Sequence, residues 1–301
     1  MSFIRPLVAL GVLACVHGQD LVPRAYLVTP VGANAVTVSS SYFTGAVFTD
    51  PTDVITDFKG NFDLTALSYT RAFRFFGRSA NASASMPYAI GNFQANVNDL
   101  FTKVYRSGFA DGRVRFSVNL RGAPAMKPEE FLKWNQKFVL GASLTVSVPL
   151  GQYDSARLIN PGLNRWGFKP ELGMERRWGR WALDLYGGVW FITANHSYFP
   201  GARTRTQDPV GAAETHVSYS FKPRLWVSFD GNFWTGGRST VDGVANYDYQ
   251  RNSRIGVTVS TPVTRTQSFK FSYSKGAYIS IGGDYRNFSA AWQYSWLSSP
   301  R

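Results

Sequence analysis

Apolar and polar residues alternate along this chain in segments of about ten residues, most regularly from Lys137 to Phe288. Side chains two apart share a face of a β-strand. Residues 113–121, for example, present one apolar face and one face that carries three arginines. Such a strand needs an apolar environment on one face and a polar environment on the other. Its repetition at this length indicates lipid outside and water inside. The pattern therefore predicts an all-β fold, a transmembrane antiparallel up-and-down β-barrel.

A soluble β-sandwich or lipocalin also has alternating strands, but three features favour the membrane barrel. The segments are about ten residues long, which suits a tilted bilayer crossing better than the usual five or six. Short connections, at 178–180, 222–224 and 264–267, alternate with long ones, at 151–165, 193–209 and 236–251. Aromatic residues such as Trp178 and Trp181 lie near strand ends, where a membrane interface favours them. Short periplasmic turns and long external loops are typical of outer-membrane barrels.

The segments predict about twelve strands, an even number as in bacterial single-chain barrels. They lie at 35–46, 62–75, 79–90, 112–122, 137–149, 166–177, 180–192, 210–221, 224–235, 252–263, 267–279 and 286–296. Residues 101–105 could form another strand, but that would make the number odd and place the mature N-terminus outside. Residues 91–111 are therefore expected to form an external loop. Residues 128–134, which begin with proline and two acids, are expected to form a short periplasmic helix.

The N-terminus has the features of an export signal. Arg5 precedes an apolar run at 7–14, and Val16 and Gly18 suit a signal peptidase, so residues 1–18 are expected to be cleaved. The alternatives are an ordinary buried segment and a lipoprotein site at Cys15. Since Cys15 is the only cysteine, cleavage after Gly18 would leave no thiol or disulfide. Residues 19–34 are expected to form a periplasmic or plug segment, and residues 35–301 the barrel.

The charge balance suggests an anion-favouring lumen. The chain has 32 lysines and arginines against 19 acids, a net charge of +13. No basic helix or aromatic RNA-binding motif accompanies this charge, and export removes nucleic acid as a partner. A basic lumen or mouth would favour anions. Alternatively, inward-facing cations and acids pair and narrow the lumen, the sets being Arg113, Arg115, Arg121, Arg254 and Lys270, and Glu171, Glu175, Asp184, Glu214 and Asp230.

Several runs resemble one family. They include LGASLTVSVPLG from Leu140, GVWFITAN from Gly188 and LWVSFDGNFW from Leu225. These runs resemble the bacterial outer-membrane transporter family known as the putative meta-pathway of phenol degradation proteins. The resemblance covers most of the mature chain and implies an outer-membrane transporter barrel, loosely linked to uptake of aromatic or other apolar compounds. It transfers no site residue. Family chains tend to finish on an aromatic residue, whereas five residues follow Trp296 here, a tail we expect to be tolerated.

Enzyme chemistry finds little support in the sequence. The mature chain offers two histidines, of which His196 lies in a loop and His216 faces the lumen beside Glu214. No nucleophile elbow, phosphate-binding glycine loop or spaced metal-ligand cluster appears. The chain is expected to be no enzyme and to use no cofactor or metal, with an outer-membrane lipid hydrolase as a minor alternative.

The sequence instead predicts passive uptake of a small solute, with aromatic or anionic compounds as the candidates, through the outer membrane of a Gram-negative bacterium. The expected partners are outer-membrane lipid, the outer-membrane assembly machinery and the solute. The alternative is a structural or adhesion barrel that acts through its external loops. Flat tryptophans could hold a ring and cations its carboxylate or phenolate, although the tryptophans could equally be internal packing. The candidate lumen-lining residues are Arg113, Arg115, Arg254, Lys270, Trp190, Trp226, Trp234, Glu214 and His216.

Overall fold

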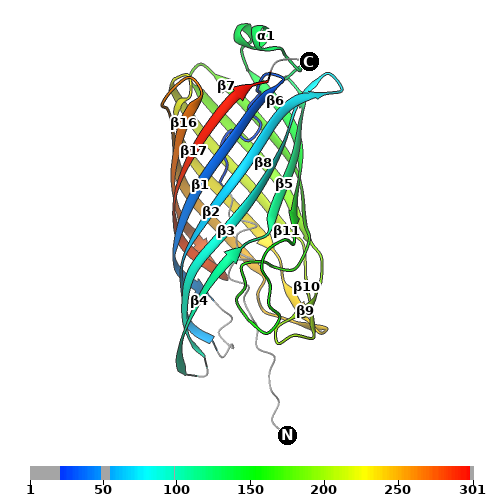
Figure 1. The fold of residues 1–301 in the computed structure, drawn as a ribbon, viewed down its shortest axis with the longest axis vertical. Coiled ribbons are helices and arrows are strands. Elements are labelled where there is room, and N and C mark those ends of the chain that lie inside the picture. The colour runs from blue at the N-terminus through cyan, green and yellow to red at the C-terminus, as the bar shows by residue number, and fades with distance from the viewer. Residues whose placement is uncertain (1–20, 49–54, 98, 299–301) are drawn as a thin grey trace.

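The computed structural model describes residues 21–48, 55–97 and 99–298, so the predicted signal at residues 1–18 lies outside the described residues. Twelve long strands form one closed antiparallel barrel (Figure 1). The first and last of them pair over their full length, from Ala33 opposite Leu297 to Phe48 opposite Gly282. The barrel strands are β1 (Ala33–Phe48), β2 (Ile55–Phe75), β3 (Arg78–Val97), β5 (Gly112–Arg121), β6 (Phe138–Val148), β7 (Gly167–Trp178), β8 (Trp181–Ile192), β11 (Val210–Lys222), β12 (Leu225–Gly236), β15 (Gln250–Pro262), β16 (Gln267–Ile279) and β17 (Gly282–Leu297).

The alternation of the sequence becomes an apolar exterior and a polar interior. On β12, Phe229 is 65% exposed on the outer face while its neighbours Ser228 and Asp230 are buried inside. Because successive side chains of a strand point to opposite faces, the same alternation recurs around the ring. The predicted fold class, a transmembrane antiparallel barrel of about twelve strands, is confirmed.

The expectation that residues 91–111 form an external loop was wrong, because most of these residues lie in strands. β3 continues to Val97, and β4 (Leu100–Phe109) pairs with it from Tyr88 opposite Phe109 to Val97 opposite Leu100. β3 pairs with β5 only between Ala80 and Ser85, so it changes partner near Pro87. The resulting β3–β4 hairpin extends past the end of the barrel (Figure 1). β4 is therefore a strand, but it is not one of the twelve strands of the closed barrel.

The two ends of the barrel differ as predicted. One end carries the tight turns and α1 (Pro128–Lys133), near the end of β17 (Figure 1). The other end carries the long connections, two of which form a small sheet of β9 (Asn195–Tyr198), β10 (Arg203–Gln207), β13 (Ser239–Val241) and β14 (Val244–Ala245). We assign the first end to the periplasm and the second to the cell exterior. Within the described ranges, no helix is both long and apolar enough to cross a membrane.

Residues 21–32, here called the N-terminal segment, lie inside the periplasmic half of the barrel. Tyr26 is 1% exposed, and its hydroxyl lies 3.0 Å from Ser143 Oγ of β6. Gly141 and Gly173, paired across β6 and β7, leave a slot for this ring, because a Cβ atom at either position would overlap it. Tyr186 of β8 packs edge-on against the ring at 5.3 Å. The N-terminal segment therefore fills lumen space that side chains of the strands leave empty.

Candidate functional site

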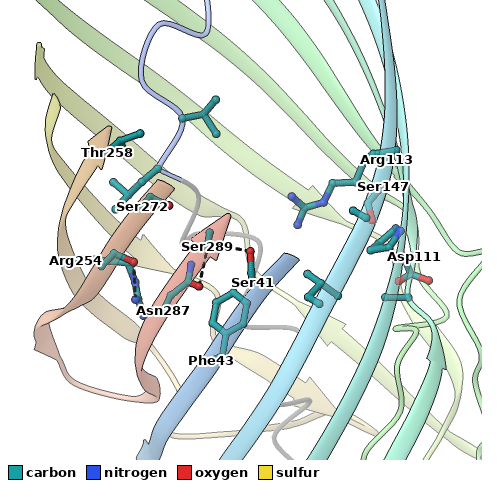
Figure 2. Close-up of a pocket in the computed structure, with 18 of the residues that line it drawn as sticks. Ser41, Phe43, Asp111, Arg113, Ser147, Arg254, Thr258, Ser272, Asn287 and Ser289 are labelled. Carbon is teal, nitrogen blue, oxygen red and sulfur yellow. Dashed lines mark hydrogen bonds between the residues drawn. The ribbon is translucent and has the colours of Figure 1, made fainter. Parts of the chain in front are cut away.

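A cavity of about 260 Å³ lies in the lumen beside the N-terminal segment. Leu21 and Val22 of that segment form part of its wall, and Pro161 and Leu163 of the connection between β6 and β7 form another part. The remaining walls come from strands on both sides of the β1–β17 seam and from β5, β6, β12 and β15. Figure 2 shows Asp111, Arg113 and Ser147 on one side of this space and Ser41, Phe43, Arg254 and Asn287 on the other. We call this space the lumenal cavity.

One side of the lumenal cavity is apolar. Phe43 of β1, Leu64 and Ala66 of β2 and Pro87 of β3 contribute to it. Phe43 belongs to a buried aromatic cluster that also contains Phe58, Phe62, Phe93 and Tyr285. Its rings are in direct contact, with centroids 4.6 Å apart for the stacked pair of Phe43 and Phe62. An apolar ring or chain would find matching contacts here.

The aromatic cluster was missed in the sequence, although a signal existed. Around Phe58 and Phe62 the alternation is reversed, because the residues between them that point outward, such as Lys59 and Asn61, are polar. A polar outer face and an apolar inner face are typical of the part of a strand that lies beyond the bilayer. Such a stretch lacks the apolar outer face that identifies a lipid-crossing strand in a sequence.

Two of the predicted cations line the lumenal cavity. Arg113 of β5 reaches into it from one side, and Arg254 of β15 stands on the other (Figure 2). Arg254 is 1% exposed, and its Nη1 donates to the carbonyl oxygen of Tyr285 at 2.8 Å and to Ser274 Oγ at 3.2 Å. The lining of the cavity thus combines the guanidinium groups of Arg113 and Arg254, the carboxylates of Asp111 and Asp230 and an apolar wall. A guanidinium group is a donor suited to a carboxylate or phenolate.

A chain of ion pairs crosses the lumen next to the cavity. Lys169 Nζ lies 2.7 Å from Glu171 Oε2 and 3.2 Å from Glu214 Oε1. Arg115 pairs with Glu171 at 3.7 Å, and His216 Nε2 lies 3.5 Å from Glu214 Oε2. The alternative in which inward cations and acids pair is therefore realised for Arg115, with Lys169, which the sequence did not single out, as its central cation. These pairs join β5, β7 and β11 and narrow the lumen.

The series of ion pairs ends at the buried carboxylate of Asp230. Its Oδ1 lies 2.8 Å from His216 Nδ1 and accepts a hydrogen bond from Ser228 Oγ at 2.6 Å, while its Oδ2 accepts one from Thr258 Oγ1 at 2.6 Å. In a nucleophilic triad the histidine lies between the serine and the acid. Here Asp230 lies between Ser228 and His216, so this histidine is not placed to take the proton of that serine.

The remaining predicted residues lie away from the lumenal cavity. Trp190 and Trp234 are buried together with Val210 and Ala212 near the external end, and Trp234 Nε1 donates to Gln250 Oε1 at 2.8 Å. Trp226, near the periplasmic end, faces the guanidinium of Arg24 at 4.5 Å and Lys270 Nζ at 5.8 Å. The three tryptophans therefore do not form one continuous surface, and their part in solute binding stays a prediction.

The external side of the lumenal cavity is covered by residues 151–166, here called the cover loop. Asp111, at the external rim between β4 and β5, joins the two ends of this loop: its Oδ1 accepts from Gly151 N at 3.1 Å and its Oδ2 from Leu163 N at 2.9 Å. Gly151 and Gly162 approach so closely that a Cβ on either would lie within 2.8 Å of the other's backbone. Burial raises the pKa of Asp111, against the opposing effect of the two backbone N–H groups. The described residues contain no cluster of His, Cys, Asp and Glu that could hold a metal ion.

Comparison with known proteins agrees with this architecture. A family model described as "Putative MetA-pathway of phenol degradation" matches residues 44–278. The COG4313 outer membrane channel from Pseudomonas putida F1 superposes with a TM-score of 0.77 at 19% identity, over 92% of this chain and 100% of that one. The β domain of the Bordetella autotransporter BrkA gives a TM-score of 0.50 at 12% identity, over 88% and 100%. At these identities the likeness concerns the fold. No curated protein sequence matches the chain.

Proposed function

Because the chain belongs to the family described as putative MetA-pathway of phenol degradation, we propose that it is an outer-membrane channel for passive uptake of small organic solutes. The solutes that fit best are acids that carry an apolar ring or chain. A closed twelve-stranded barrel with an apolar outer face belongs in the outer membrane of a Gram-negative bacterium. One solved barrel with the same fold is named an outer membrane channel, which supports the general class.

The lumenal cavity carries this proposal. It places the guanidinium group of Arg113 opposite the wall that contains Phe43, and Arg254 lies on the same side as Phe43. Charge-assisted hydrogen bonds from a guanidinium suit a carboxylate, and the wall suits the body to which the carboxylate is attached. The ion pairs and the N-terminal segment limit the free cross-section. Transport is therefore expected to be slow, selective and driven only by the solute gradient.

The test is flux through the mature protein in liposomes, with benzoate and the neutral benzyl alcohol as probes. Arg113→Gln should lower benzoate flux by roughly fivefold to tenfold, the effect of about 1 kcal/mol or slightly more at one charged contact, and leave benzyl alcohol flux unchanged. Arg238→Gln, an exposed arginine of an external loop, is the matched control. Unchanged benzoate flux in the Arg113 variant, or no flux of either probe through the unsubstituted protein, would contradict the proposal.

Planar bilayers give a second measurement on the same protein. The proposal expects a small steady conductance with anion preference in a salt gradient, reduced by Arg113→Gln. The competing function is binding through external loops, which is favoured by the exposed Phe101 and Tyr105 on the β3–β4 hairpin. Shortening that hairpin would abolish partner binding by an adhesin, whereas a channel would still conduct.

Three further expectations belong to this proposal. Cleavage after Gly18 would make Gln19 the first residue of the mature chain, two positions before the N-terminal segment. Outer-membrane lipid would cover the apolar outer face, and the assembly machinery would insert the barrel. The protein would act without enzymatic chemistry or a cofactor.

A further inference from the structure

A second hollow, of about 400 Å³, lies outside the lumen on the external side. It is bounded by residues 105–107 of β4 and by the part of the cover loop from Gln152 to Pro161. We call it the outer groove. Pro161 lines both the outer groove and the lumenal cavity. The two spaces therefore share this residue of the cover loop as part of their walls.

The outer groove holds a fixed guanidinium group. Arg106 Nε donates to the carbonyl oxygen of Ile159 at 2.8 Å, and its Nη1 donates to the carbonyl oxygen of Tyr105 at 2.8 Å. These two bonds use two of the five N–H groups of a guanidinium and fix its plane between β4 and the cover loop. The side chain is thus held in place before any ligand arrives, which reduces the entropy lost on binding.

The charge of the outer groove is positive. Arg157 is a second arginine of its wall, and its Nε lies 2.9 Å from Asp154 Oδ2. Burial and the charge of Arg157 lower the pKa of Arg106, so the two guanidinium groups act on each other. Two arginines and one aspartate leave one net positive charge in the groove. A concave cationic surface at a mouth raises the local concentration of anions.

We propose that the outer groove is a recognition site for small organic acids, in which Arg106 binds the acid group before the solute moves past Pro161 to Arg113. This inference rests on the proposed function, because the lumenal cavity provides the second site. Tyr153 of the cover loop also belongs to the wall of the groove, and an aromatic ring suits the organic part of such a solute. Displacement of the cover loop near Pro161 would join the two spaces.

The first test measures how benzoate flux depends on its concentration. Arg106→Gln should raise the concentration that gives half-maximal flux by about fivefold, as expected for loss of one partly exposed charged contact, with little change in maximal flux and none in benzyl alcohol flux. Lys103→Gln is the matched control, because Lys103 is exposed on the same strand outside the groove. An unchanged half-maximal concentration, or an equal change in the Lys103 variant, would overturn the inference.

A binding measurement separates this inference from the proposed function. Equilibrium dialysis of labelled benzoate against the detergent-solubilised Arg113→Gln protein reports the outer groove, and adding Arg106→Gln should remove most of the remaining binding. Binding lost in this way without any flux through the unsubstituted protein would support the groove and refute the channel. Flux that is independent of Arg106, together with unchanged binding, would refute the groove alone. Displacement of benzoate by an equal concentration of inorganic phosphate would contradict a site for organic acids.

Discussion

At Asp111 one carboxylate holds both ends of the cover loop, so its protonation state acts directly on the loop. Burial raises its pKa above the ordinary value of 3.8. Asp111 therefore binds a proton more readily when the cover loop is closed than when it is open or unfolded. Lowering the pH consequently favours the closed loop. The stability that protonation contributes is complete below about 3.8 and is lost as the pH rises through the raised pKa.

This sign predicts how the cover loop responds to acid. Hydrogen-exchange protection of the Gly151 and Leu163 amides, corrected for the intrinsic effect of pH, should rise as the pH is lowered from about 7 to about 4. Asp111→Asn keeps one acceptor oxygen and places its NH2 group against the other backbone N–H, so it should lower protection but remove this pH dependence. Asp111→Ala, which loses both hydrogen bonds, should lower protection by about 1–3 kcal/mol. Protection that falls with acid, or a pH dependence that survives in the Asn variant, would show that another group controls the loop.

At the scale of elements, the sequence predicted the strands that cross lipid and missed those that do not. Each of the twelve barrel strands overlaps its predicted range because lipid and water impose a period of two on its residues. β4 lies outside the closed wall of twelve strands, and its adjacent Leu100 and Phe101 are both exposed. Alternation therefore carries no information there.

The site was predictable only in part, for a geometric reason. Parity tells whether a side chain points into the lumen, and it placed Arg113, Arg115 and Arg254 there. It does not tell which of them face one space, because that depends on the stagger and tilt of strands far apart in the chain. The structure puts Arg113 and Arg254 on the lumenal cavity and Arg115 beside Glu171 and Tyr26.

The N-terminal segment depends on the glycine slot that holds Tyr26. Gly173→Ala places a methyl group where the Tyr26 ring lies, so the ring must leave or the strands must shift, at a cost of about 1–3 kcal/mol. We expect higher conductance and faster trypsin cleavage after Arg24 in the refolded protein. Gly187→Ala, on the neighbouring β8 and with no atom within 4 Å of the added methyl group, is the control. If both variants behave alike, the slot does not retain the segment.

For the whole molecule, the outer face of the barrel wall contacts lipid and the inner face lines the lumen. The position of the barrel in the membrane can be tested on two lipid-facing phenylalanines. Phe229 lies near the middle of β12, whereas Phe221 lies next to the periplasmic turn that follows β11. Phe229→Arg should lower the free energy of unfolding in liposomes by about 2–4 kcal/mol, and Phe221→Arg by about 0–1 kcal/mol. Equal losses in urea titrations of the two variants would contradict the assigned membrane position.

The position of the N-terminal segment also has a consequence for the order of assembly. The segment directly precedes β1, yet Tyr26 and Arg24 contact β6, β8 and β11, which belong to the middle of the chain. Those strands can form a curved sheet before β17 arrives to close the seam with β1. A segment already docked on that sheet holds β1 close to it, so β1 and β17 are near each other before they pair. The entropy cost of closing a loop as long as the whole chain is then divided among smaller, earlier steps. The residues that narrow the finished lumen would thus also serve as the guide that brings its two edges together.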